Sequence, residues 1–204
     1  MKKRTCILLL PLILLAFHQF KIQPEKEKWK LDRGHSKITF TVTHLLISEV
    51  EGRFHDFDAD IYANPNDWTN PNIEIIIKTK TLDTDNEDRD KHLRSADFFD
   101  VERYPEIKFK VVSMKKISEK NYKIKGNMTI KNITKTIDLD AKYGGMIEDP
   151  IDGKTKAGFK VWGNINRYDF GLKWNISSTA ELTAVSPEVA IECFVRLEKY
   201  TNKK

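Results

Sequence analysis

The sequence has little cysteine and no strong excess of either charge, and each shortage excludes a class of protein. Of the two cysteines in 204 residues, Cys6 lies at the start of the chain and Cys193 near its end. Once the first segment is removed, Cys193 has no partner, so an intramolecular disulfide is excluded. Beyond residue 22 the chain carries 31 basic and 30 acidic residues. This near neutrality excludes a nucleic-acid binder, because phosphate binding requires a large local excess of Lys and Arg.

Motifs of catalysis and metal binding are also missing. The sequence contains no Gly-x-Ser-x-Gly, no glycine-rich phosphate loop, and no serine or cysteine with an evident local base. The four histidines after the first segment form no His-x-His or His-x-x-x-His pair, so the spacing typical of a metal site is absent. The residues therefore predict neither an enzyme nor a metal or cofactor site.

The sequence has no apolar run long enough to span a membrane, and a short apolar run stands at its start. Met1–Thr5 carries three positive charges, and the next twelve residues, Cys6–Phe17, carry none. A membrane-spanning helix needs about 20 apolar residues, whereas a charged start followed by a short apolar run is typical of a secretory signal. We therefore expect residues 1–22 to be a signal peptide, with an uncleaved membrane tether as the alternative. Residues 23–204 are then one domain of a periplasmic or secreted protein.

What the sequence does contain is alternation of apolar and polar residues. The clearest case runs from Tyr122 to Lys131, where Tyr, Ile, Gly, Met and Ile alternate with Lys, Asn and Thr. Such alternation indicates antiparallel strands with one face on a core and one in water. About eight strands are predicted, at residues 37–43, 50–61 (with a bend at Gly52), 73–79, 107–114, 122–130, 135–143, 155–166 and 187–197. Eight strands can close into a barrel, so we expect an all-β, eight-stranded antiparallel barrel.

One segment between two predicted strands breaks the alternation. It begins with Thr84-x-x-Glu87, which has the form of a capping box. Acidic residues come early in this segment and basic residues late, as the helix dipole favours. We therefore expect a short helical insertion over residues 86–94. Its basic residues can either bind an anionic group or pair with neighbouring aspartates.

Aromatic residues make up 10% of the chain, and they allow two interpretations. They can fill the core of the barrel, or they can line an apolar cavity, since an eight-stranded barrel is near the size that holds one small ligand. A filled barrel and a hollow barrel have the same composition, so composition leaves both open.

Four stretches carry more specific motifs than the alternation does. They are Trp29-x-Leu31-Asp32-x-x-His35-Ser36-x-Ile38-x-Phe40, then Leu82-Asp83-Thr84-x-Asn86-Glu87-x-Arg89-Asp90-x-His92-Leu93-Arg94-Ser95-x-Asp97-Phe98-Phe99-Asp100, then Gly126-Asn127-Met128-Thr129-Ile130-Lys131-Asn132-Ile133-Thr134-Lys135, and finally Arg167-x-Asp169-Phe170-Gly171-Leu172. In this order the chain resembles the YceI-like lipid- and polyisoprenoid-binding family over about residues 29–197. Asn132 stands where the family customarily has Gly, and Asn also tolerates a left-handed backbone.

The resemblance implies a lipocalin-like, eight-stranded antiparallel barrel that holds an isoprenoid-type lipid in its interior, without catalysis, cofactor or metal. Each buried CH₂ contributes about 0.8 kcal/mol, so an apolar interior is enough to hold a long chain. The resemblance therefore implies lipid transport, storage or sequestration. The alternatives are a quinone binder that works with a membrane cytochrome and an enzyme that acts on a lipid. The expected partners are the lipid itself, a membrane or a membrane cytochrome in transient contact, and a second copy in a homodimer.

Parity within the strands, together with the two phenylalanines that follow the helix, gives the residues expected to contact the lipid. They are Ile38, Phe40, Val42, Ile75, Ile77, Phe98, Phe99, Phe109, Tyr122, Ile124, Met128 and Phe159. The polar head group has to lie at a mouth of the barrel or be satisfied by donors. The candidates to contact it are Arg53, Arg89, His92 and Arg94. The alternative is that these four only tie the helix to the sheet through Asp83, Asp90, Asp97 and Asp100.

Overall fold

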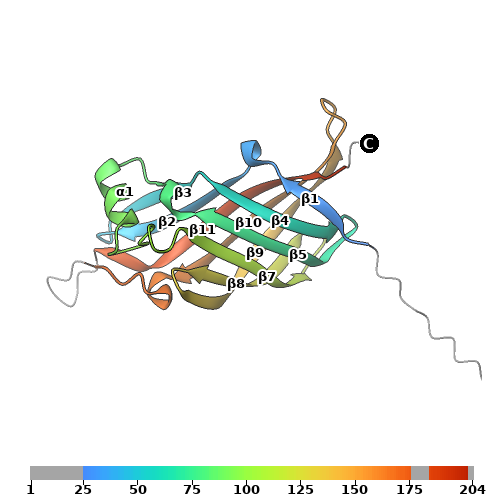
Figure 1. Cartoon of the computed structure of the whole chain (residues 1–204). Coiled ribbons are helices and arrows are strands. Elements are labelled where there is room, and N and C mark those ends of the chain that lie inside the picture. Colours follow the sequence, from blue (N-terminus) through green and yellow to red (C-terminus); the bar gives the residue numbers. More distant parts are fainter. Residues whose placement is uncertain (1–24, 176–183, 202–204) are drawn as a thin grey trace, which may run out of the picture.

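The computed structural model of the protein describes residues 25–175 and 184–201, which form one antiparallel sheet that closes on itself (Figure 1). The strands are β1 (Glu27–Leu31), β2 (Lys37–His44), β3 (Ser48–Phe54), β4 (Phe57–Asn64), β5 (Asp67–Lys78), β6 (Leu82–Asp83), β7 (Glu106–Lys116), β8 (Asn121–Ile130), β9 (Ile133–Glu148), β10 (Thr155–Asn166) and β11 (Val185–Lys199). The helical elements are the α-helix α1 (Glu87–Arg94) and the short 3₁₀ turns η1 (Arg33–His35), η2 (Thr79–Thr81) and η3 (Arg167–Phe170).

The eleven strands make an eight-stranded barrel, because three pairs of short strands follow one another along the same path. β1 and β2, separated by η1, both pair with β11, and β5 continues through η2 into β6. β3 and β4 are separated by two residues and pair with β2 and β1, respectively. The pairing of β1 with β11 closes the ring. The expected eight-stranded antiparallel barrel is thus confirmed.

The predicted strand over residues 50–61 is wrong in one detail. The break falls at His55–Asp56, between β3 and β4, and not at Gly52. Gly52 lies within β3, directly opposite Phe40 of β2. A Cβ atom at Gly52 would lie 2.2 Å from Cζ of Phe40. Glycine is needed there to make room for an inward-facing ring and not to bend the strand.

The helical insertion is present as α1, which lies at one end of the barrel in the connection between β6 and β7 (Figure 1). Its N-cap is Asn86, whose side chain accepts a hydrogen bond from the backbone N–H of Arg89 at 3.0 Å. The Thr84 hydroxyl does not cap the helix, because it donates to the buried carboxylate of Asp90 at 2.6 Å. The helix expected over residues 86–94 is confirmed, whereas the expected capping box does not form.

Aromatic side chains pack at the end of the barrel opposite α1. Trp68, near the start of β5, lies with its ring centroid 5.3 Å from that of Trp29 and 4.9 Å from that of Phe159. The Tyr143 ring lies 5.0 Å from Phe159. Trp29 and Trp68 are both buried, so large rings fill this end of the interior.

The expected signal peptide, residues 1–22, lies outside the described residues. Over residues 25–175 and 184–201, no helix is long and apolar enough to cross a membrane.

Candidate functional site

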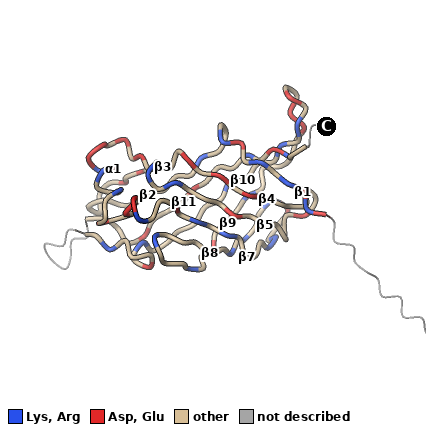
Figure 2. The backbone as a smooth tube through the Cα atoms, in the orientation of Figure 1, with Lys and Arg blue, Asp and Glu red and all other residues tan. Residues whose placement is uncertain are grey.

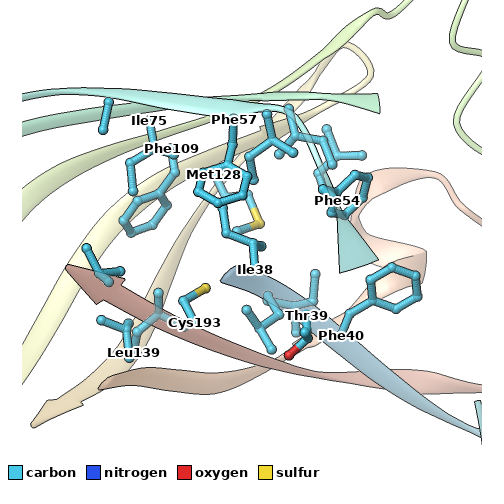
Figure 3. A pocket seen from close by; sticks show the side chains of 18 of the residues that line it. Ile38, Thr39, Phe40, Phe54, Phe57, Ile75, Phe109, Met128, Leu139 and Cys193 are labelled. Atoms are coloured by element: carbon cyan, nitrogen blue, oxygen red, sulfur yellow. The ribbon is translucent and has the colours of Figure 1, made fainter. Parts of the chain in front are cut away.

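The barrel encloses a cavity of about 230 Å³ (Figure 3). The cavity extends along the barrel, since its lining includes Trp68 at the aromatic end as well as Phe98, which follows α1, and Arg167 of η3 at the other. Nearly all of the lining side chains are aliphatic or aromatic. One water needs about 10–15 Å³ of such space, so the barrel is hollow enough for an extended apolar ligand.

Strands β2, β10 and β11 contribute the largest group of partly buried residues to the cavity wall. Inward-facing residues on these three strands are only partly buried, although the barrel shields them from outside; they are Phe40, Val42, Phe159, Val161, Val189, Ile191, Cys193 and Val195. Inward-facing residues of β4, β7 and β8, such as Phe57, Phe109 and Met128, are buried against one another.

The structure places eleven of the twelve predicted lipid-contact residues on the cavity. They are Ile38, Phe40, Val42, Ile75, Ile77, Phe98, Phe99, Phe109, Ile124, Met128 and Phe159, and five of them are labelled in Figure 3. Tyr122 does not line the cavity, although its side chain is buried. Burial, followed by the nearby Asp67 and Tyr143, raises the pKa of the Tyr122 phenol. Contact of these residues with a lipid stays a prediction.

Arg53, the head-group candidate outside the helix, lies on β3 and points to carboxylates. Its Nη2 lies 3.0 Å from Oδ2 of Asp83 and 2.8 Å from Oδ1 of Asp85. His55 shares the Asp83 carboxylate at 2.8 Å. Hydrogen bonds from His55, from the backbone N–H of Asp85 and from Arg53 hold the pKa of Asp83 well below its usual range. Arg53 does not line the cavity.

The remaining three candidates belong to α1, and two of them bind the backbone beside it. Arg89 donates from Nε to the Thr84 hydroxyl at 2.8 Å and from Nη2 to the Thr84 carbonyl at 2.7 Å. Arg94 donates to the carbonyl of Leu82 and lies 3.8 Å from the carboxylate of Asp90. Both arginines therefore tie α1 to the segment that precedes it.

His92 is the third candidate on α1, and it contacts Asp97 and two aromatic rings. Its Nε2 lies 3.1 Å from Oδ2 of Asp97, and its ring packs edge-to-face on Phe98 and Trp174. None of the four candidates lines the cavity. Their contacts correspond to the alternative in which they hold the helix to the sheet, and a role for them in head-group binding stays a prediction.

Arg167 is a cavity residue that sequence reasoning missed. It is the one charged side chain among the described residues that line the cavity, and it is only 3% exposed. Nε donates to the carbonyl of Ser186 at 2.9 Å, Nη1 to those of Leu172 and Trp174, and Nη2 to that of Val185 at 2.8 Å. The Arg-x-Asp-Phe-Gly motif marked this position as special, but nothing local indicated that the arginine turns inward.

The charge of Arg167 has no counter-ion among the described residues. Its hydrogen-bond acceptors are four backbone carbonyls and, at 3.5 Å, the hydroxyl of Tyr168. Burial lowers the pKa of its guanidinium. A buried cation that is bonded only to neutral groups favours an anion or an electron-rich oxygen nearby. The α1 end of the cavity is therefore the polar end of the site.

Cys193 lines the middle of the cavity on β11 (Figure 3). Burial raises the pKa of its thiol to about 12, so the thiol is neutral at physiological pH and a poor nucleophile. No group of three metal-ligating side chains occurs within residues 25–175 and 184–201. What the described cavity offers is an apolar surface with a single cation at one end.

Comparison with known proteins agrees with this geometry. The YceI-like domain family matches residues 29–197. A UPF0312 protein of Pectobacterium carotovorum is 34% identical over 191 residues, which cover 94% of this chain and 95% of that protein. The crystal structure of a YceI protein from Campylobacter jejuni has a TM-score of 0.68 and 32% identity, covering 78% of this chain and 90% of that one. A polyisoprenoid-binding domain from Saccharophagus degradans shares the fold, with a TM-score of 0.65 at 14% identity over 86% of this chain and all of that one.

Proposed function

The chain belongs to the YceI-like domain family, and from this membership and its hollow barrel we propose that it is an exported, non-enzymatic binding protein for an isoprenoid-type lipid. It holds the apolar chain of the lipid in the barrel for transport, storage or sequestration.

The observation that carries this proposal is the apolar cavity that extends along the barrel. Its lining comes from most of the strands, and apart from Thr39, Cys193, Arg167 and the indole of Trp68 it consists of hydrocarbon side chains and two thioethers. Such a surface gains about 0.8 kcal/mol for each CH₂ group that it removes from water. It offers few directional contacts along the chain, so it suits a long flexible hydrocarbon better than a compact polar molecule.

We place the polar end of the lipid near Arg167. A head group with a phosphate or carbonyl oxygen would neutralise or solvate the buried guanidinium, whereas at the aromatic end it would meet Trp68 and Phe159. Because the N–H groups of Arg167 are already bonded to backbone carbonyls, its contribution is mainly electrostatic.

Native mass spectrometry of the purified protein, followed by extraction of what is bound, tests the proposal. We expect a bound mass that matches a prenyl chain, released by organic solvent and restored when geranylgeraniol is added to the emptied protein. An emptied protein that binds neither geranylgeraniol nor a longer polyprenol would overturn the proposal. Geranylgeranyl phosphate should bind more tightly than geranylgeraniol if Arg167 contributes as described.

The extracted head group separates two forms of this function. A polyprenol or polyprenyl phosphate indicates a lipid carrier, whereas a quinone ring on the prenyl chain indicates a redox-carrier binder that works with a membrane cytochrome. The cavity wall serves both, because the two ligands share the prenyl chain.

A further inference from the structure

The turn between β2 and β3 exposes three consecutive large apolar residues, which we call the apolar tip. Leu45 is 42% exposed, Leu46 65% and Ile47 87%. No charged residue stands between His44 and Glu49. Single apolar residues on a surface are common, but a contiguous group of them marks an interaction site.

The backbone conformation of the apolar tip is one that leucine disfavours, which indicates that its leucines serve a purpose other than folding. Leu45 and Leu46 have φ angles of 51° and 63°, and the N–H of Ile47 donates to the carbonyl of His44 at 3.3 Å. This is a hairpin turn with two left-handed residues, which Asn-Gly makes with least strain and which leucine disfavours. The other described non-glycine residues with positive φ are polar: Asp85, Asp100 and Lys131.

The tip lies beside the polar end of the cavity. His44 pairs with Val185 in the β2–β11 ladder, and the N–H of Leu45 donates to the carbonyl of Ala184 at 2.9 Å. Val185 and Val42 both line the cavity. Figure 1 shows the β2–β3 turn at the same end of the barrel as α1. The exposed turn therefore lies next to residues of the cavity wall.

We propose that the apolar tip inserts into the surface of a lipid bilayer and holds the α1 end of the barrel against it, so that lipid can pass between bilayer and cavity. The lipid-transfer part of this statement rests on the proposed function. Charges of both signs lie on α1 and β3 at this end (Figure 2), so the attraction is hydrophobic and requires no anionic lipid.

The opposite end offers a matched control. Ile151, in the hairpin between β9 and β10, is 93% exposed, but it stands between Asp149 and Asp152, both of which pair with Lys156. The neighbouring interior is filled by aromatic rings. An exposed isoleucine within a charged hairpin is not expected to enter a bilayer.

A polarity-sensitive fluorophore at one position tests the docking in the full chain. It is attached at Ile47→Cys or, in the control, at Ile151→Cys, with Cys6→Ser and Cys193→Ala in both proteins so that no other thiol reacts. With phosphatidylcholine vesicles we expect a blue shift of the probe at position 47 and none at position 151. Adding phosphatidylglycerol should change the apparent affinity little. A shift at both positions or at neither overturns the proposal, as does a shift at position 47 that depends on protein concentration without vesicles, which would indicate a second copy on the tip.

The double variant Leu45→Asn/Leu46→Gly separates docking from folding. It removes the apolar side chains and supplies the residues that the turn prefers, so the protein should melt at the same or a higher temperature. Its vesicle affinity, read from the probe at position 47, should fall about ten-fold or more, because two leucine side chains no longer leave water. Unchanged affinity in a folded variant would contradict the proposal.

Failure of docking and failure of lipid binding remain distinguishable. Geranylgeraniol supplied from detergent micelles reaches the cavity without a bilayer, so the double variant should bind it as the wild type does. If the wild type does not bind geranylgeraniol from micelles, the proposed function fails, while the probe at position 47 still reports whether the tip enters the bilayer.

Discussion

Filling the cavity at Cys193 should strengthen the fold and weaken ligand binding at the same time. Cys193 faces the free space between Ile38 of β2 and Val161 of β10, its partners in the two ladders. In Cys193→Phe, the ring projects into a cavity of about 230 Å³ that has no described side chain to fill it. Cavity-filling substitutions commonly raise the free energy of unfolding by about 0.5–2 kcal/mol.

The loss of ligand affinity follows from the length of prenyl chain that the ring displaces. Excluding two to five carbons, the latter being one isoprene unit, costs about 1.6–4 kcal/mol at about 0.8 kcal/mol each. The dissociation constant of geranylgeraniol should therefore rise by about 15- to 1,000-fold. The opposite signs of the two effects are the diagnostic feature, since a damaged fold would lose stability and binding together.

The titration can be followed by tryptophan fluorescence, because Trp68 lines the cavity, and the free energy of unfolding by urea denaturation. The matched control is Ala190→Phe, which places the same ring on the exposed outer face of β11. It should leave the dissociation constant unchanged. Wild-type affinity in Cys193→Phe, or an equal loss in Ala190→Phe, would refute the assignment of the cavity as the ligand site.

Three further predictions concern Arg167, Gly52 and Asp83. Arg167→Met should lower the free energy of unfolding by at least about 3 kcal/mol in urea denaturation, because it leaves buried carbonyls without donors. Arg167→Lys should restore only part of this free energy, because lysine has three donors in place of five. Full stability in the Met variant would contradict this prediction. Gly52→Ala should lower the free energy of unfolding by about 1–3 kcal/mol, because the new Cβ meets the Phe40 ring. The double variant Gly52→Ala/Phe40→Leu should lose less free energy of unfolding than the two single variants added together. Strictly additive losses would refute the contact. Because the pKa of Asp83 is lowered in the folded protein, its ionised carboxylate stabilises the fold fully at pH values above 3.8, the ordinary pKa of aspartate. This stabilisation is lost as the pH falls below 3.8. The melting temperature should therefore drop more steeply below about pH 4 in the wild type than in Asp83→Asn, and parallel curves would contradict this.

Alternation along the chain was sufficient to predict the strands and the direction of their side chains. Because the side-chain period of a strand is two, the outward lysines and threonines of residues 122–131 determine which neighbours face the core. That is why almost every lipid-contact residue predicted from parity lies on the cavity. Tyr122 is the exception, because parity gives the face of a side chain but not its position along the barrel, and this buried side chain does not line the cavity.

The partners of charged side chains depended on contacts that alternation does not encode. Arg53, Arg89 and Arg94 were recognised as a basic group near the helix, but whether they reach a ligand depended on which acceptors the packed helix brings near them. Those acceptors proved to be Asp83, Asp85 and Asp90, together with the Thr84 hydroxyl and two backbone carbonyls. Arg167, by contrast, was part of a motif and yet turns inward, because its acceptors are carbonyls 5–19 positions away, in the segment after η3 and at the start of β11.

The sequence by itself therefore determined the all-β class and the inner face of the strands that it predicted, since these follow from local periodicity. It did not mark β1 or β6 as strands. Only the tertiary structure decided that the barrel is hollow, that it closes through β1 and β11, and that Arg167 is the one cation among the described residues that line the cavity. Cavity volume is the small difference between the space enclosed by eight strands and the side chains that fill it. It depends on all of these side chains together, and no stretch of the sequence specifies it alone.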